Sequence, residues 1–183
     1  MYGTPTKEQA RVIRPFVRGK VVHDLGAGDL RLSKRLRSWG AERVVALDKK
    51  LPRKIPEGVD FKEGYFKDFT EAPEVVWLSW PVNHEAPGLV GILERTPLVL
   101  YLGTNTNGTA CGGQDLWRHL RTREVLAYEA DLSNTLIVYG VNRVERGLCG
   151  EEVAALDDSK WWTFQEAEKA SQLQVNALGC ASL

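Results

Sequence analysis

The stretch 21–50 restricts the fold of this chain more than any other part, because it reads VVHDLGAGDLRLSKRLRSWGAERVVALDKK. Val21–Leu25 is an apolar run of the kind that forms a buried parallel strand. The Gly-Ala-Gly sequence at 26–28 then turns the chain where a side chain would obstruct a ligand. A helical repeat of apolar residues follows, and a second apolar strand at 43–47 ends at Asp48. This order predicts an α/β fold with a parallel sheet.

The same stretch predicts half of a nucleotide site at the carboxyl edge of the sheet. Backbone N–H groups of a glycine turn, and of the helix that begins after it, are expected to face a ligand at this edge. Asp48 lies 20 residues after Gly28. A carboxylate at that position can accept hydrogen bonds from both hydroxyls of a ribose. The residues therefore predict a ligand that contains a nucleoside.

Two classes of cofactor use such a unit, and the glycines distinguish them. The dinucleotide pattern G-x-G-x-x-G needs a third glycine where this chain has Arg31. The other pattern has an acid two residues before the first glycine, and Asp24-Leu25-Gly26-Ala27-Gly28 matches it. On these residues, together with Asp48, the chain resembles the class I S-adenosylmethionine (SAM)-dependent methyltransferases. That superfamily often has a third glycine where this chain has Leu30.

The resemblance implies a single three-layer Rossmann-like domain with a mostly parallel, seven-stranded sheet. Such a sheet ends in an antiparallel hairpin, whose last strand inserts beside the fifth. Residues 124–131 and 135–141 carry a hairpin signal of their own. Pro52 and Pro56 predict that the crossover helix after Asp48 is reduced to a loop or a single turn.

The 183 residues read as one methyltransferase-like domain over 1–183. Within it we expect an N-terminal helix at 6–18, a core sheet at 21–142 and a C-terminal helical extension at 150–170. Pro15 is expected to kink the first helix or to end it near the preceding residue.

The resemblance also assigns cofactor-binding roles. Asp24 and the turn at Gly26, Ala27 and Gly28 would hold the amino-acid end of SAM, and Asp48 would bind the ribose. Family members often place an acid near the end of the third strand to contact the adenine amino group. Tyr65 stands at that position here, and its ring could stack on the adenine instead. Asp68 could then supply the hydrogen bond.

The end of the fourth strand, near residue 80, is where the chemistry takes place in this superfamily. The chain reads Ser79-Trp80-Pro81-Val82 there, a partial match to the [DNS]-P-P-[YFW] motif of amino-group methyltransferases. Trp80 could face the cationic sulfonium or a cationic acceptor through its ring. His84 is a candidate base by location only. A core strand that ends at a proline explains the same residues equally well.

The charges are unevenly distributed, although the net charge is zero. Residues 1–67 carry 16 lysines and arginines against 8 acids, and residues 68–183 carry 8 against 16. Several cations lie between Lys49 and Lys54, close to the predicted ligand edge. They could contact an anionic substrate, or they could belong to a solvated loop.

Composition excludes other classes of protein. No apolar run is long enough to span a membrane, and the first residues do not form a secretory signal. Cys111, Cys149 and Cys180 are far apart, which indicates reduced intracellular thiols and gives no metal spacing. With only three histidines, we expect no metal site. The chain is thus expected to be cytoplasmic.

The resemblance implies an enzyme with S-adenosyl-L-methionine as cofactor. Such an enzyme must align the acceptor in line with the methyl group and the sulfur, and must exclude water. The acceptor remains open among RNA, a protein side chain and a small molecule, and so does the oligomeric state. Two other interpretations also remain: a non-catalytic binding protein that kept the fold, and an NAD-type Rossmann protein.

Overall fold

A seven-stranded sheet forms the centre of the computed structural model, which describes residues 4–81, 86–103, 111–130 and 135–142. Its strand order is β3-β2-β1-β4-β5-β7-β6. The first five strands are parallel, and β7 runs antiparallel between β5 and β6. The strands are β1 (Val21–Leu25), β2 (Arg43–Asp48), β3 (Val59–Glu63), β4 (Val75–Ser79), β5 (Leu98–Gly103), β6 (Arg123–Ala130) and β7 (Thr135–Asn142). The predicted sheet, with its terminal hairpin inserted beside the fifth strand, is confirmed.

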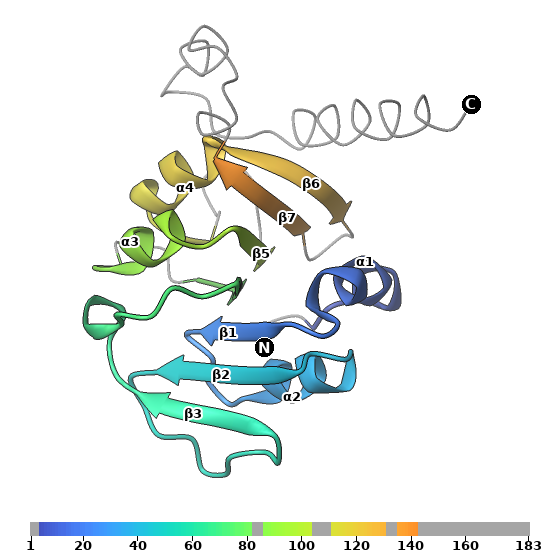
Figure 1. Ribbon diagram of the computed structural model, residues 1–183, viewed down its shortest axis with the longest axis vertical. Helices are drawn as coiled ribbons and strands as arrows, with labels where there is room; N and C mark the ends of the chain where they lie inside the picture. Colours follow the sequence, from blue (N-terminus) through green and yellow to red (C-terminus); the bar gives the residue numbers. More distant parts are fainter. Residues whose placement is uncertain (1–3, 82–85, 104–110, 131–134, 143–183) are drawn as a thin grey trace, which may run out of the picture.

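Helices cover both faces of this sheet (Figure 1). They are α1 (Lys7–Val17), α2 (Arg31–Ser38), α3 (Leu89–Glu94) and α4 (Gln114–Arg121), with a 3-10 turn η1 (Phe66–Asp68). Two apolar clusters form the core, one against α1 and α2 and the other against α3 and α4. Each fully buried large apolar side chain contributes about 1.5–3 kcal/mol to folding. The molecule therefore has the three layers that the sequence predicts.

The strands supply apolar residues to both clusters because their side chains alternate between the two faces. In the register of β1 with β2, Val22 pairs with Val44 and Leu25 pairs with Leu47. The first pair lies in the cluster with α1 and α2, and the second pair lies in the other. Continuous apolar strands are typical of parallel sheets that are covered on both sides.

Helix α1 begins at a capping box and continues past Pro15. The Thr6 side chain accepts a hydrogen bond from the N–H of Gln9, and the Gln9 side chain accepts one from the N–H of Thr6. The helix continues through Pro15 to Val17. Val17 is fully buried, and this burial holds the last turn although Pro15 lacks an N–H donor. Of the two expectations for Pro15, the one that ends the helix near Arg14 is therefore wrong, and the helix with its caps fills the predicted range 6–18.

The two crossovers that flank β3 are short. The connection from β2 to β3 contains no helix, as predicted, and the connection from β3 to β4 contains only η1. We did not expect the second reduction. The large hydrophobic side chains that are most exposed in the described residues all lie in these connections: Leu51 at 65%, Ile55 at 44% and Tyr65 at 60%. The carboxyl edge of the sheet is consequently open to solvent beside β2 and β3.

Two predictions fall outside the described residues, namely the helical extension at 150–170 and the position of His84. In the part that is described, no helix has both the length and the apolar character to cross a membrane.

Candidate functional site

A cavity of about 500 Å³ lies at the carboxyl ends of β1, β2 and β4. This volume falls within the ~300–1,000 Å³ of small-molecule sites. Six of the predicted site residues line it: Gly26, Asp48, Tyr65, Ser79, Trp80 and Pro81. The structure thus brings the predicted nucleotide end and the predicted acceptor end into one cavity.

The glycine turn has its amide groups already occupied. Gly26 and Ala27 both donate to the Leu47 carbonyl oxygen, at 2.8 and 3.1 Å. The N–H of Gly28 donates to Asp48 Oδ2 at 2.9 Å. The expectation that these three N–H groups face a ligand is therefore wrong, because the end of β2 accepts all of them. The turn contributes shape instead: Gly26 and Gly28 have φ of 75° and 57°, and a Cβ at Gly28 would meet open space.

The Asp48 carboxylate joins the turn to the segment that follows β2. Besides Gly28, it accepts a hydrogen bond from the N–H of Lys50, at 3.0 Å from Oδ1. Asp48 is partly exposed and lines the cavity. Each carboxylate oxygen can accept more than one hydrogen bond. Asp48 is thus fixed in orientation and still able to accept hydroxyl groups.

Asp24 lies beneath the turn and does not line the cavity. It is completely buried, and its Oδ2 accepts a hydrogen bond from the Ser33 hydroxyl at 2.5 Å. Its Oδ1 has no hydrogen-bond partner among the described residues. Burial raises the pKa of Asp24 from its ordinary 3.8 to about 7, while the Ser33 hydrogen bond opposes the rise and the charge of Asp48 adds to it. The unpaired oxygen is therefore suited to carry a proton.

Leu30 explains how the chain does without a third glycine. Its φ is 62°, the left-handed region that glycine adopts most easily. Its side chain is fully buried in the cluster under α2. Because that side chain points into the core, it does not obstruct the cavity. Asp29, next to it, accepts a hydrogen bond from the N–H of Arg31 at 3.2 Å.

The two residues expected near the adenine lie in different surroundings. Tyr65 lines the cavity with its ring 60% exposed, and the Lys67 ammonium lies 5.7 Å from the ring centroid. Asp68 is exposed in η1 and is absent from the lining. Ala27 and Gly28 also lie outside the lining. Of the two residues expected near the adenine, Tyr65 is thus the one that lines the cavity.

At the end of β4, Trp80 has an unusual backbone conformation. Its φ is 51°, which costs a bulky residue about 1–3 kcal/mol. The N–H of Trp80 donates to the Leu102 carbonyl oxygen at 2.7 Å, so the neighbouring strand holds the turn. Ser79 and Pro81 flank it in the wall of the cavity. Strained backbone conformations are found most often at functional sites. Here the left-handed conformation of Trp80 turns the chain along the wall of the cavity.

Sequence reasoning missed part of the cavity wall. It is formed by Phe66, Lys67, Ala86, Pro87 and Leu89. Gly88 brings the two segments together, since a Cβ on it would lie 2.5 Å from backbone atoms of Lys67. Its φ of 89° adds a second reason for glycine. The Pro-Gly pair before α3 was the only signal in the sequence.

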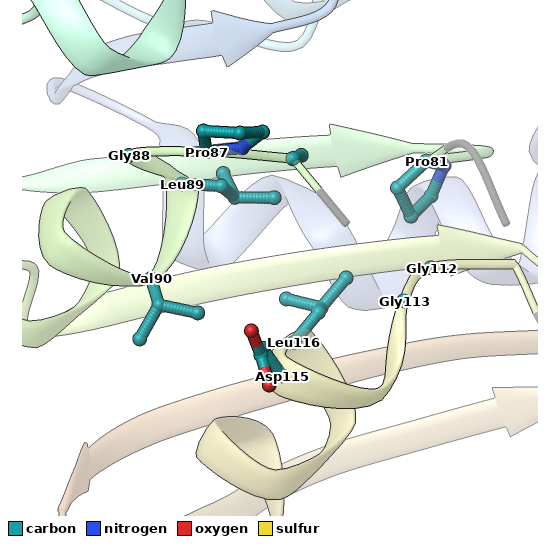
Figure 2. A pocket seen from close by; sticks show the side chains of 10 residues that line it. Pro81, Pro87, Gly88, Leu89, Val90, Gly112, Gly113, Asp115 and Leu116 are labelled. Atoms are coloured by element: carbon teal, nitrogen blue, oxygen red, sulfur yellow. The ribbon is translucent and has the colours of Figure 1, made fainter. Parts of the chain in front are cut away.

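A second cavity of about 300 Å³ adjoins the first and shares Pro81, Ala86, Pro87 and Leu89 with it. Figure 2 shows this cavity between the 86–90 segment and the start of α4. Asp115 is the charged residue of its described lining and pairs with Arg118 at 3.4 Å. Nowhere in the described residues do three or more His, Cys, Asp or Glu side chains gather as metal ligands would.

Comparison with known proteins gives structural matches only. No protein-family model and no curated protein sequence matches the chain. One match is a methyltransferase of Burkholderia thailandensis, which acts on 1,6-didemethyltoxoflavin and was solved with S-adenosylhomocysteine. Its TM-score is 0.57, and it is 16% identical over 74% of this chain and 77% of that one. A candidate RNA methyltransferase of Pyrococcus horikoshii matches with a TM-score of 0.59 and 15% identity, over 78% and 86%.

A third match is a Haloferax volcanii protein, a candidate methyltransferase solved in complex with the activator Trm112. It has a TM-score of 0.53 and 16% identity over 75% of this chain and 89% of that one. At these identities the likeness establishes the fold. The strand order and these matches together show that the chain has the Rossmann-like fold of the class I SAM-dependent methyltransferases.

Proposed function

We propose that this protein is a SAM-dependent methyltransferase. The observation that carries the proposal is that one cavity runs from Asp48 and the glycine turn to the strained Trp80 at the end of β4. A methyltransferase needs a nucleoside site and an acceptor site that meet at the reacting methyl group. The methyltransferase fold supports the same proposal.

The residues present fit S-adenosyl-L-methionine as the cofactor. Asp48 would accept hydrogen bonds from the ribose hydroxyls, and the exposed ring of Tyr65 would cover the adenine. Asp24, which is buried beneath the turn and outside the cavity lining, would support the turn that holds the amino-acid end of the cofactor. When bound, the cofactor supplies a methyl group that its sulfonium has already activated.

The protein would contribute alignment and exclusion of water at the end of β4. Ser79 and Pro81 would position the acceptor, and the Trp80 ring would face the positive charge of the sulfonium or of the acceptor. An amine acceptor also needs a base. The described lining contains no histidine, and we retain His84 as the candidate base by its place in the sequence.

Thermal unfolding with added ligands tests this proposal. A ligand at 100 times its dissociation constant raises the unfolding free energy by about 2.7 kcal/mol. We expect SAM and S-adenosylhomocysteine (SAH) to raise the melting temperature and NAD to leave it unchanged. A response to NAD alone would overturn the proposal in favour of an NAD-type Rossmann protein. Arg31 and the inserted strand β7 argue against that outcome.

One observation favours a second candidate, a non-catalytic binding protein with this fold. Ser79-Trp80-Pro81-Val82 has a single proline and no aromatic residue in the last place of the [DNS]-P-P-[YFW] motif. Such a protein would bind SAH and transfer no methyl group. Methyl transfer from labelled SAM to RNA, protein or small molecules of a cell extract separates the two candidates. A cytoplasmic location, indicated by the widely separated cysteines, belongs to the same proposal.

A further inference from the structure

Five cations lie at the cavity or on the connection that leaves it, and we call them the basic rim: Lys49, Lys50, Arg53, Lys54 and Lys67. All five side chains are exposed. Lys49 and Lys67 line the cavity itself, and the other three lie on the 49–58 connection that begins at its edge. Any acceptor that enters the cavity past Lys49 and Lys67 meets positively charged side chains.

The basic rim is unpaired among the described residues, although Asp48 and Glu57 lie next to it in the sequence. None of its members forms an ion pair within the described part of the chain, whereas other exposed cations do: Lys20 pairs with Glu74, Arg43 with Asp60 and Lys62 with Glu71. Like charges this close repel one another, and salt screens them only beyond about 8–10 Å. A partner that carries repeated negative charges would remove this repulsion.

The backbone of the rim is suited to lie along such a partner. Pro52 and Pro56 prevent a helix, and the segment between β2 and β3 stays on the surface. Six extended residues, such as 49–54, can reach up to about 20 Å. Leu51 and Ile55 alternate with the cations and are exposed by 65% and 44%. Charged and apolar side chains thus lie among one another along the 49–58 connection.

We propose that the basic rim binds the phosphate backbone of single-stranded RNA and so presents a base to the cavity. This inference rests on the proposed methyltransferase function and names its acceptor. A single strand carries one charge on every nucleotide, which matches a row of cations better than one small anion does. Its unpaired bases can leave the stack and enter a pocket, whereas a duplex must first be opened.

The test compares two triple variants that remove the same charge. Lys50→Gln, Arg53→Gln and Lys54→Gln lie in the rim and outside the cavity lining. Arg11→Gln, Arg14→Gln and Lys34→Gln remove three exposed cations of α1 and α2, which also form no ion pairs among the described residues. Affinity for a short mixed-sequence single-stranded RNA is measured between about 50 and 200 mM salt. SAH affinity is measured separately by calorimetry.

We expect the rim variant to bind the RNA at least tenfold more weakly than the control. The slope of log affinity against log salt should fall by about 2, since each lost phosphate contact on a single strand removes about 0.7. SAH affinity should stay unchanged in both variants. With labelled SAM and a cell extract, label should enter RNA in the wild type and be reduced in the rim variant.

Three outcomes would overturn the inference: equal RNA affinity of the two variants, tighter binding of duplex RNA, or label in protein, DNA or lipid instead of RNA. If SAH binds and RNA does not, the inference fails and the proposed function stands. If RNA binding depends on the rim and SAH does not bind, the proposed function fails and the RNA surface stands.

Discussion

The two halves of the cavity differ in how their polar groups are arranged. In the first half, at the ends of β1 and β2, hydrogen bonds fix the carboxylates: Gly28 donates to Asp48, and beneath the cavity Ser33 donates to one oxygen of Asp24. In the second half, at the end of β4 and the start of α3, the wall next to the cavity is largely apolar and Ser79 is its polar side chain. The first half can hold a polar ligand in one orientation without rearrangement. The second half is shaped by backbone conformation.

Two residues with a left-handed backbone conformation show the same contrast. Leu30 and Trp80 are the described non-glycine residues with positive φ, at 62° and 51°. Leu30 is buried in the core, so its strain is offset by packing of the first half. Trp80 lines the cavity, so its strain is placed where the acceptor would bind. We infer that the first half determines which cofactor binds and that the second half determines what is methylated.

The largest expected effect concerns the buried carboxylate of the first half. Between pH 4 and 7 the folded protein keeps a proton on Asp24 that the unfolded chain has lost, so the unfolding free energy falls as the pH rises. Asp24→Asn mimics the protonated form. It should be about as stable as wild type at pH 4 and up to about 4 kcal/mol more stable at pH 8. Urea unfolding across this range measures the difference. The same pH dependence of the unfolding free energy in both proteins would show that folding does not raise the pKa of Asp24.

Gly28→Val should abolish SAH binding, a loss of at least 100-fold. A branched side chain would occupy the open space over the turn and resist a φ of 57°. Gly19→Val is the matched control, because Gly19 has a φ of 68° and open space around it but precedes β1, at the opposite end of that strand from the turn. Calorimetry should show wild-type affinity for the control. Normal binding by Gly28→Val would mean that no cofactor lies over this turn.

Asp48→Ala should weaken SAH binding by about 1.5–3 kcal/mol for each lost charged hydrogen bond. The melting temperature of the empty protein should also fall slightly, because Asp48 accepts hydrogen bonds from Gly28 and Lys50. Asp29→Ala removes a carboxylate that likewise accepts a backbone N–H but lies outside the cavity. Calorimetry of both variants, and of Asp48→Asn, which should recover little, checks this. Equal affinities for Asp48→Ala and Asp29→Ala would place the ribose elsewhere.

The smallest effect concerns the second half. Gly88→Ala should lower the unfolding free energy by about 1–3 kcal/mol, because the new Cβ meets the Lys67 backbone at 2.5 Å. Gly91→Ala, three residues on in α3, meets nothing within 4 Å and should raise it by about 0.5–1 kcal/mol. Chemical unfolding measures both. Opposite signs would confirm that Gly88 closes the cavity wall, and two stabilised variants would contradict this.

The fold could be predicted because its signals are local. The apolar strands, the glycine turn and the hairpin each lie within a short stretch, and the prolines at 52 and 56 indicated the missing helix. Two details were less accessible. The sequence left open whether Pro15 ends helix α1, and the helix continues to Val17, whose burial depends on distant strands. The loss of the helix between β3 and β4 leaves no comparable mark, since 64–74 contains one proline, Pro73.

The candidate site was predicted in part, for the same reason. Asp48 and Gly26 follow strands directly, so their place at the sheet edge follows from the topology. The hydrogen bonds of the turn to the end of β2 depend on the strand register and could not be read from spacing. Phe66 and Pro87 reach the cavity through a close approach at Gly88, which joins segments far apart in sequence. Asp68 was assigned by position along the chain, and η1 leaves it outside the lining.

A crystal structure with SAH tests the central claim most directly, because it locates both halves of the site at once. We predict that SAH fills the cavity between the glycine turn and β4. Its ribose hydroxyls should lie about 2.7–3.0 Å from the Asp48 carboxylate oxygens, and its sulfur should face Ser79, Trp80 and Pro81. SAH bound away from Asp48, or with its sulfur directed away from the end of β4, would contradict the assignment of the cofactor and the acceptor to one cavity.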